Sequence, residues 1–155
     1  MKKTFSWEAF DKAPIVAIFR NLDSNDLLQV AQCFKVTGLS TMEITLNSKN
    51  ATEDIARLVK EFGEELNIGA GTVCDMDDLH AALAAGAQFI VTPILDEEVI
   101  QFCVTNQIPV FPGAFTPTEI YKAWKLGANM VKVVPSSALG PGYIKDLLGP
   151  LDSIK

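Results

Sequence analysis

The stretch "TMEITLNSKNATEDIARLVKEFGEELNIGAG" (41–71) sets a helical pattern between two short apolar runs, and it decides the fold. "TMEITL" (41–46) and "NIGAG" (67–71) have the length and the composition of buried strands. Between them, "NATEDIARLVKEFG" (50–63) has apolar residues at helical spacing, opens with a capping asparagine and ends with a glycine. The stretch therefore predicts a strand–helix–strand unit with parallel strands.

The same alternation recurs along the chain. Further strands are predicted at 14–19, 88–93, 108–113 and 130–135. Further helices are predicted at 24–38, 75–86, 96–106, 116–127 and 140–149. Successive strands begin 27, 26, 21, 20 and 22 residues apart, and no segment rich in Pro, Gly or Ser separates them. Such regular repetition predicts a parallel α/β sheet with helices outside it.

Two architectures fit this repetition, an open doubly wound sheet and a (β/α)8 TIM barrel. Polar residues recur inside strands or at their C-terminal ends, and a barrel gathers such positions at one mouth. We therefore expect the barrel family. A closed barrel needs eight units and typically about 250 residues, whereas six units are recognisable here and "GPLDSIK" (149–155) ends where a seventh strand would begin. We expect residues 1–155 to form a single, incomplete βα-barrel domain, truncated by about two units.

Composition narrows the functional classes. The chain has 155 residues, 48 % of them hydrophobic and 21 % charged, with a net charge of -6. This acidic balance argues against nucleic acid or an anionic membrane as a partner. No apolar run approaches the roughly 18 residues of a membrane span, and the three cysteines are widely spaced, as expected of reduced thiols. We expect a cytoplasmic protein.

Lys132 is the most informative single residue. It lies inside "MVKVVP" (130–135), an apolar run with β-branched neighbours, although lysine is rarely buried without a partner. One interpretation is a strand lysine whose head reaches water or a carboxylate. The other is a nucleophile that attacks a carbonyl, for which an apolar wall favours the required uncharged amine.

Glu43 strengthens the second interpretation. It is the only acidic residue inside any predicted strand. It is either the partner of a buried cation or a group that moves protons beside an imine. Thr45 lies two positions further along the same strand and therefore faces the same side. A barrel interior would hold Glu43 on the second strand opposite Lys132 on the sixth.

Strand ends supply the remaining candidates. Arg20 ends the first strand and is either a surface residue or a bidentate ligand for carboxylate or phosphate. In "GAGT" (69–72), Gly71 and Thr72 mark either a tight turn or a place where backbone N–H groups approach an anion. Pro93 ends the fourth strand, and physical reasoning alone gives it no chemistry.

At these residues the sequence resembles a known family, the class I 2-keto-3-deoxy-6-phosphogluconate (KDPG) aldolases, often bifunctional with 4-hydroxy-2-oxoglutarate (KHG) aldolase. The matching motifs lie in family order and cover nearly the whole chain. They are "PIVAIFR" (14–20), "MEITLNS" (42–48), "IGAGTV" (68–73), "AGAQFIVTP" (85–93), "FPGAFTPTE" (111–119) and "VKVVPSSALGPGYIKDLLGP" (131–150).

The resemblance implies a lyase of carbohydrate metabolism, in the Entner–Doudoroff pathway, with a (β/α)8 barrel and commonly a homotrimeric assembly. It implies cleavage of a 2-keto-3-deoxy-6-phospho sugar acid to pyruvate and glyceraldehyde 3-phosphate. Cleavage of 4-hydroxy-2-oxoglutarate to pyruvate and glyoxylate is a second activity that it suggests. It also implies that no metal or other cofactor takes part, because the electron sink would be a covalent imine on a lysine.

The resemblance also implies roles for individual residues. Lys132 would form the Schiff base, and Glu43 would act as general base and acid. The substrate-binding residues would be Arg20 for an anion, Gly71 and Thr72 for the pyruvate carboxylate, and Thr45 and Pro93 as further groups of the pocket.

Three departures from the family pattern leave alternatives open. Asn47 stands where members acting on the gluconate often carry arginine, and "LNS" (46–48) is closer to the 2-keto-3-deoxy-6-phosphogalactonate aldolases. Val134 replaces a frequent aromatic residue, and the glycine-rich phosphate loop of the seventh strand is absent. The alternatives are a galactonate-type aldolase, a sugar-phosphate epimerase or isomerase, and a non-catalytic, truncated keto-acid-binding remnant. A metal aldolase is disfavoured, since His80 is the only histidine.

Overall fold

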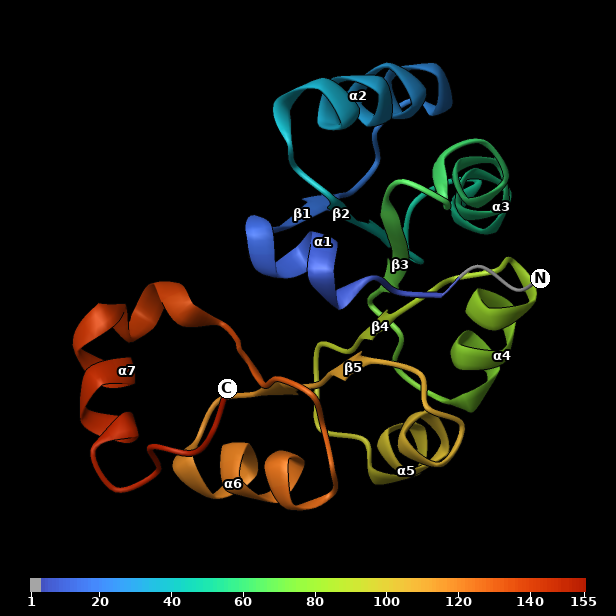
Figure 1. Cartoon of the computed structure of the whole chain (residues 1–155). Coiled ribbons are helices and arrows are strands. Elements are labelled where there is room, and N and C mark those ends of the chain that lie inside the picture. The colour runs from blue at the N-terminus through green and yellow to red at the C-terminus, as the bar shows by residue number, and fades with distance from the viewer. Residues whose placement is uncertain (1–3) are drawn as a thin grey trace.

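The computed structural model describes residues 4–155 and shows parallel strands that largely alternate with helices along the chain (Figure 1). The strands are β1 (Val16–Phe19), β2 (Thr41–Thr45), β3 (Asn67–Gly71), β4 (Ile90–Val91), β5 (Val110–Phe111), β6 (Gly113–Ala114) and β7 (Lys132–Val133). The α-helices are α1 (Trp7–Lys12), α2 (Ser24–Thr37), α3 (Ala51–Phe62), α4 (Met76–Ala84), α5 (Glu97–Thr105), α6 (Pro117–Lys125) and α7 (Gly140–Leu148). A short 3-10 helix, η1 (Ser136–Ala138), precedes α7.

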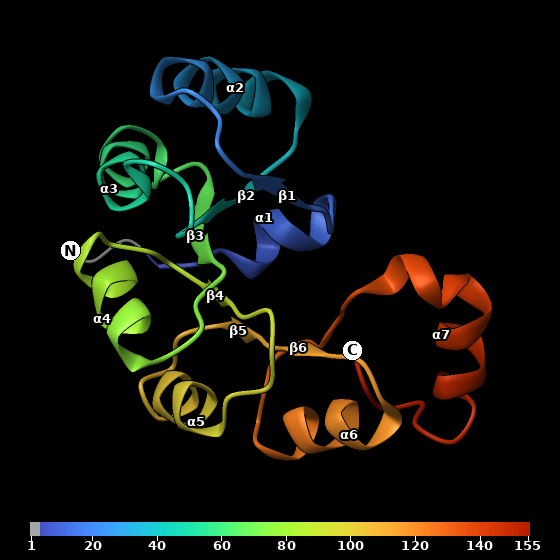
Figure 2. The same cartoon turned by 180° about the vertical axis from the view of Figure 1, so that it is seen from behind.

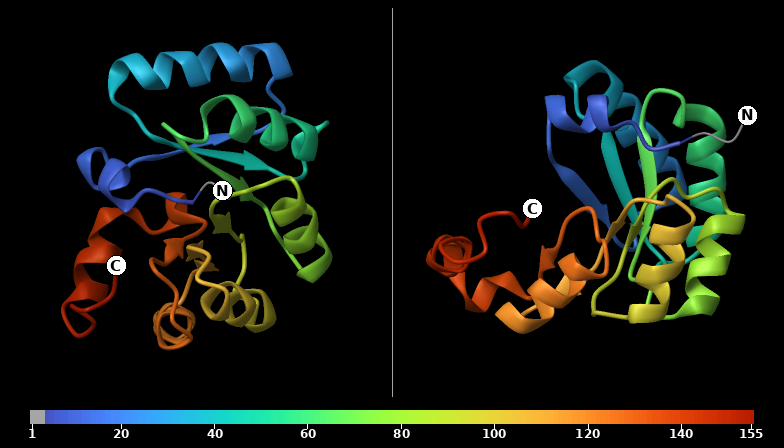
Figure 3. Two further views of the ribbon diagram at one scale, coloured as in Figure 1. Left: turned by 45° about the vertical axis from the view of Figure 1, so that its right-hand side comes forward. Right: turned by 60° about the horizontal axis from the view of Figure 1, so that its bottom comes forward.

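Neighbouring strands pair in chain order. β1 to β5 form one parallel sheet, and β6 pairs in parallel with β7. Seen from behind and from two further directions, the helices that follow the strands lie on the outer side of their curve (Figures 2 and 3). This arrangement confirms the predicted α/β fold of the TIM-barrel type, with six strand–helix units within the described residues.

The structure corrects several predicted boundaries. The strand expected at 108–113 is divided into β5 and β6 at Pro112, which has no N–H to donate to a ladder. Asp23, not Ser24, caps α2, because its carboxylate accepts a hydrogen bond from the Asn25 amide at 2.9 Å. Asn50 precedes α3 in a left-handed conformation, and its side chain makes no capping bond. The capping residues in the sequence therefore locate the starts of these helices to within one residue.

The N-terminal segment, for which no helix was predicted, covers the N-terminal ends of the strands. Ser6 exchanges backbone hydrogen bonds with the side chain of Asn67, the first residue of β3, at 2.7 and 3.1 Å. Phe5 packs against the rings of Phe89 and Phe111, with centroids 5.4 and 6.1 Å away. Because this end is covered, the C-terminal strand ends form the accessible mouth.

Among the three apolar clusters of the described residues, a larger and a smaller one support different strands. The larger one lies between the β1–β5 sheet and its helices and includes Ile55, Leu58, Ile68 and Ile100, all fully buried. The smaller one joins β6 to α6, α7 and the last residues through Ala114, Ile120, Leu147 and Ile154. No helix of the described chain combines the length and the apolar character needed to cross a membrane.

Candidate active site

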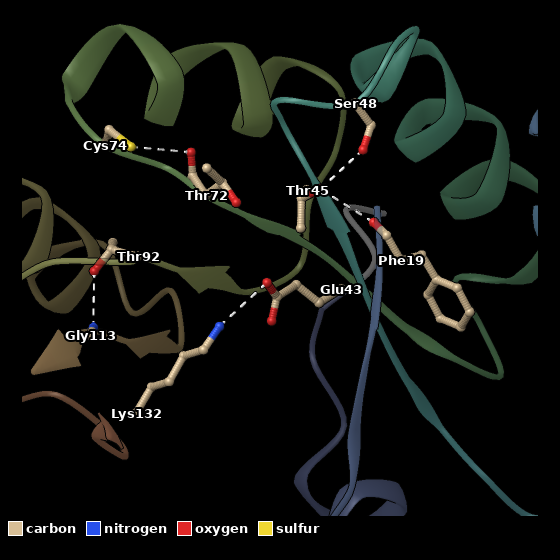
Figure 4. A network of polar contacts seen from close by, with 9 residues as sticks. All are labelled: Phe19, Glu43, Thr45, Ser48, Thr72, Cys74, Thr92, Gly113 and Lys132. Atoms are coloured by element: carbon tan, nitrogen blue, oxygen red, sulfur yellow. Dashed lines mark hydrogen bonds and ion pairs between the residues drawn. The ribbon is translucent and has the colours of Figure 1, made fainter. Parts of the chain in front are cut away.

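Glu43 and Lys132 face each other across the inside of the curved sheet. Glu43 lies in the middle of β2, in register with Ile18 of β1 and Gly69 of β3. Its side chain is 2 % exposed, that of Lys132 is 29 % exposed, and Lys132 Nζ lies 3.7 Å from Glu43 Oε1 (Figure 4). The structure thus brings together the two residues that the sequence analysis placed on facing strands.

The backbone of β7 holds Lys132 at this position. The amide of Lys132 donates to the carbonyl of Pro112 at 2.9 Å, and that of Val134 donates to the carbonyl of Ala114 at 3.0 Å. On the other side of β7, the amide of Val131 donates to the carbonyl of Lys155 at 2.8 Å. The backbone around Lys132 is therefore held by hydrogen bonds to residues 112–114 and to Lys155.

A cavity of about 260 Å³ lies beside the two charged groups, which form part of its wall. It is lined by Val16, Ile18, Glu43, Val91, Phe111, Met130, Val131 and Lys132. Apart from the glutamate and the lysine, every lining side chain is apolar. The space is below the range of about 300–1,000 Å³ that sites for drug-sized ligands occupy, so it suits a small substrate.

The electrostatic environment prepares Glu43 for proton transfer. Burial raises the pKa of this carboxyl above its ordinary value, while the nearby charges of Lys132 and, more weakly, Arg20 offset part of the rise. A carboxyl with a raised pKa both accepts and returns protons more readily near neutral pH. A carboxyl whose pKa is raised by burial, and which lines a cavity, is also a candidate functional group.

The other candidate residues lie at the C-terminal ends of strands rather than in the cavity wall. Arg20 follows β1, Gly71 ends β3 and Thr72 comes after it, and Pro93 lies two residues beyond β4. Thr45 is the last residue of β2. They occupy the mouth of the barrel, where parallel-barrel enzymes bind their substrates.

Thr45 is fully buried, and its hydroxyl bonds within the chain. It donates to the carbonyl of Phe19 at 3.4 Å and hydrogen-bonds the hydroxyl of Ser48 at 3.0 Å (Figure 4). Ser48 also accepts from the amide of Asn21 at 2.9 Å. The Thr45–Ser48 pair thus ties the ends of β1 and β2 together beside Arg20. The sequence analysis did not single out Ser48, although it is part of the "LNS" motif.

The "GAGT" motif is a strand and its end, not a tight turn through the glycines. Gly69 and Gly71 belong to β3, and the left-handed backbone conformation falls on Thr72, with φ at 57°. Such a conformation is costly for a β-branched residue and tends to occur at functional sites. The carbonyl of Thr72 accepts from the thiol of Cys74 at 3.6 Å.

Beyond β4, the chain lies against β6. The buried hydroxyl of Thr92 accepts a hydrogen bond from the amide of Gly113 at 3.2 Å and also bonds the carbonyl of Ile94 (Figure 4). A Cβ at Gly113 would overlap the backbone of Pro93. Pro93 is therefore placed next to the strand that pairs with Lys132.

The histidine and the acidic residues do not form a metal site within residues 4–155. No three His, Cys, Asp or Glu side chains of this range are arranged to hold a metal ion. His80 lies on the exposed side of α4, with its ring 5.6 Å from that of Phe102. It is an ordinary helix-surface residue.

Comparison with known proteins identifies relatives of the whole described barrel. The sequence model of the KDPG and KHG aldolase family matches residues 7–155. The chain is 38 % identical to the 2-dehydro-3-deoxy-6-phosphogalactonate aldolase of Escherichia coli, over 92 % of this chain and 69 % of that protein. It is 35 % identical to the 2-dehydro-3-deoxy-phosphogluconate aldolase of Pseudomonas aeruginosa, over 92 % of this chain and 63 % of that protein.

A solved structure matches as well. It is the crystal structure of KDPG aldolase from Legionella pneumophila with pyruvate captured as a covalent carbinolamine intermediate, with a TM-score of 0.82 and 27 % identity over 95 % of this chain and 71 % of that one. The chain thus spans about two thirds of the length of its relatives. These relatives are aldolases, which are carbon–carbon lyases. The chain belongs to the KDPG and KHG aldolase family.

Proposed function

We propose that the chain carries the catalytic centre of a class I aldolase, with Lys132 as the residue that forms the imine. Its substrate is a 2-keto-3-deoxy-6-phospho sugar acid, which it cleaves to pyruvate and glyceraldehyde 3-phosphate. One observation carries the proposal. An amine 3.7 Å from a buried carboxyl opens onto a cavity that is otherwise apolar.

The reaction begins when the uncharged amine of Lys132 attacks the keto carbon to give a carbinolamine. Loss of water then leaves a protonated imine, which draws electrons from the neighbouring carbon. The Legionella pneumophila neighbour, in which pyruvate was captured as a covalent carbinolamine, supports this first step by analogy.

Glu43 moves the protons in the later steps. It takes the proton of the C4 hydroxyl through a water molecule, the C3–C4 bond breaks, and the aldehyde leaves. The electron pair of that bond remains as an enamine, and Glu43 returns a proton to C3 to form the methyl group. Hydrolysis of the imine then releases pyruvate and restores the amine. The raised pKa of Glu43 supports this double use.

The residues at the mouth bind and orient the substrate. Arg20 is exposed at the end of β1 and attracts an anionic group. Gly71, Thr72 and Pro93 surround the keto-acid end, and Thr45 maintains the arrangement of the first two strand ends. No metal or organic cofactor is needed, because the imine itself accepts the electrons.

The galactonate epimer is a second candidate substrate. Asn47 and the "LNS" motif favour it, and the Escherichia coli relative named for the phosphogalactonate shares 38 % identity, against 35 % for the Pseudomonas aeruginosa relative named for the phosphogluconate. The two substrates differ in configuration at C4, the carbon whose hydroxyl loses its proton. Cleavage of 4-hydroxy-2-oxoglutarate to pyruvate and glyoxylate belongs to the same proposal.

We place this aldolase in the cytoplasm, as a single βα-barrel domain in a homotrimer acting in the Entner–Doudoroff pathway. The family resemblance supports these points. The competing proposal from another class is a non-catalytic keto-acid binder, which would keep Lys132 and the cavity but would not cleave a sugar acid.

The decisive experiment combines pyruvate trapping with a turnover assay. The protein is incubated with pyruvate and borohydride, and its peptides are mapped by mass spectrometry, with a sample lacking pyruvate as control. We expect a reduced adduct on Lys132 and release of pyruvate from one or both epimeric phospho sugar acids. An adduct without cleavage of either epimer would favour the keto-acid binder. The absence of an adduct on correctly folded protein would refute the imine chemistry.

A further inference from the structure

Two glycines leave part of the inner face of β3 without side chains, and side chains from neighbouring segments fill the space. Ala70 points outward into the main apolar cluster, while Gly69 and Gly71 share the opposite face. A Cβ at Gly69 would overlap the ring of Phe89, and a Cβ at Gly71 would overlap the carboxylate of Glu43. Each glycine thus makes room for one particular side chain.

The contact at Gly71 involves the end of the catalytic candidate. A Cβ there would lie 2.5 Å from Cδ and 2.6 Å from Cγ of Glu43, and closer still to Oε1. Real Cβ atoms do not approach other heavy atoms this closely, because repulsion rises steeply below van der Waals contact. Glu43 cannot keep its present conformation if residue 71 carries a side chain.

The displaced oxygen is the one that faces the amine. Glu43 Oε1 overlaps the added Cβ, and the same atom lies 3.7 Å from Lys132 Nζ. Glu43 is 2 % exposed, and its side chain lines the cavity, which offers space into which the carboxylate can move. Such a movement changes its distance to the amine and to any carbon bound there.

We propose that Gly71 is a positioning residue, whose missing side chain fixes where the carboxylate of Glu43 meets the imine carbon. This inference rests on the proposed aldolase chemistry and assigns Gly71 a task other than binding the pyruvate carboxylate. A misplacement of about 1 Å is enough to cost about 10²-fold in rate.

The functional test is Gly71→Ala, read by two assays on the full chain. Borohydride trapping of pyruvate reports imine formation on Lys132, and deuterium exchange of the pyruvate methyl group reports proton transfer by Glu43. We expect exchange to slow by about 10²-fold more than trapping does, with an altered pH profile of exchange. Parental exchange, or an equal loss in both assays, would overturn the positioning role.

A comparison of unfolding stabilities in two backgrounds tests the same contact if Gly71→Ala folds poorly. Gly71→Ala is compared with Gly71→Ala in the Glu43→Ala background, where the overlapping atoms are gone. We expect the added methyl to lower the urea midpoint in the parent and to be tolerated in that background. Gly69→Ala is the matched control, because its overlap is with Phe89 and Glu43→Ala should not relieve it. Equal destabilisation by Gly71→Ala in both backgrounds would overturn the proposal.

The outcomes separate this inference from the proposed function. If the parent forms no adduct on Lys132, the aldolase proposal itself fails. If the parent is trapped and exchanges while Gly71→Ala exchanges equally fast, only the positioning role fails.

Discussion

The two charged residues of the candidate site come from regions that are packed very differently. Glu43 belongs to β2, which with β3 forms the centre of the β1–β5 sheet, and every residue of both strands is buried. Lys132 belongs to β7, a half-buried strand of two residues that pairs with β6. Behind β2 lies the larger apolar cluster, and behind β7 the smaller one.

The difference teaches how one site meets two opposed requirements. A proton carrier must hold its position, and the fully packed sheet supplies that rigidity. A nucleophile must meet an incoming keto acid, and the 29 % exposure of the Lys132 side chain leaves it within reach. The acid is therefore fixed by the interior, while the amine is presented from a more open edge.

Removing the amine should have the largest effect on function. We expect Lys132→Ala to abolish both pyruvate trapping and turnover, because no other group forms the imine. The fold should persist, since the side chain lies in the less packed region. The assays are borohydride trapping and pyruvate release. Lys125→Ala, on the exposed face of α6, is the matched lysine control and should behave as the parent. Residual turnover by Lys132→Ala would show that Lys132 is not the residue that forms the imine.

Neutralising the acid should have the next largest effect. We expect Glu43→Gln to permit some trapping, since Lys132 remains, but to slow methyl-proton exchange by about 10²–10⁴-fold, the usual contribution of a general acid–base group. The measurement is NMR of pyruvate in deuterium oxide. If exchange continued at the parental rate, Glu43 would not be the proton carrier. Another acid would then have to move the proton.

Matched leucine substitutions test the packing difference directly. Leu58 is 1 % exposed in the larger cluster, and Leu147 is 8 % exposed in the smaller one. Burial of a leucine among many neighbours makes its truncation costly, so we expect Leu58→Ala to lower the free energy of unfolding by about 3–5 kcal/mol and Leu147→Ala by about 2 kcal/mol or less. Urea unfolding measures both. Equal losses would mean that the two regions are packed alike.

Much of this organisation could be predicted from the sequence. The order of strands and helices followed from periodicity and caps, and the meeting of Glu43 with Lys132 followed from two charged residues in otherwise apolar strands. The periodicity and the caps are local signals, whereas the meeting of Glu43 with Lys132, 89 positions apart, also depended on the predicted barrel.

What the sequence analysis missed depends on contacts between distant segments. The Ser48 hydroxyl accepts a hydrogen bond from the amide of Asn21, 27 positions away, which requires the ends of β1 and β2 to lie together. The position of Gly71 suggested a turn or an anion contact. In the structure, the space beside Gly71 is filled by the side chain of Glu43, which lies 28 positions earlier in the sequence. Helix α1 is only six residues long, too short for a periodic pattern.

The smallest expected effect is on the pH dependence of stability. Burial raises the pKa of Glu43 in the folded chain above its unfolded value of about 4.3. The folded state therefore binds more protons between those two pKa values, and stability falls as pH rises through that window. Glu43→Gln cannot ionise, so we expect its unfolding free energy to lack this fall when urea titrations are run from acid to neutral pH.

Lys132→Ala sharpens the same measurement. The charge of Lys132 lowers the pKa of Glu43 and opposes the effect of burial. Without that charge the folded pKa rises further, so the loss of stability should extend to higher pH and become larger than in the parent. Parallel curves for the parent, Lys132→Ala and Glu43→Gln would show that the carboxyl is as well solvated in the folded chain as in the unfolded one. The conclusion that Glu43 lies in a rigid, desolvated part of the site would then be wrong.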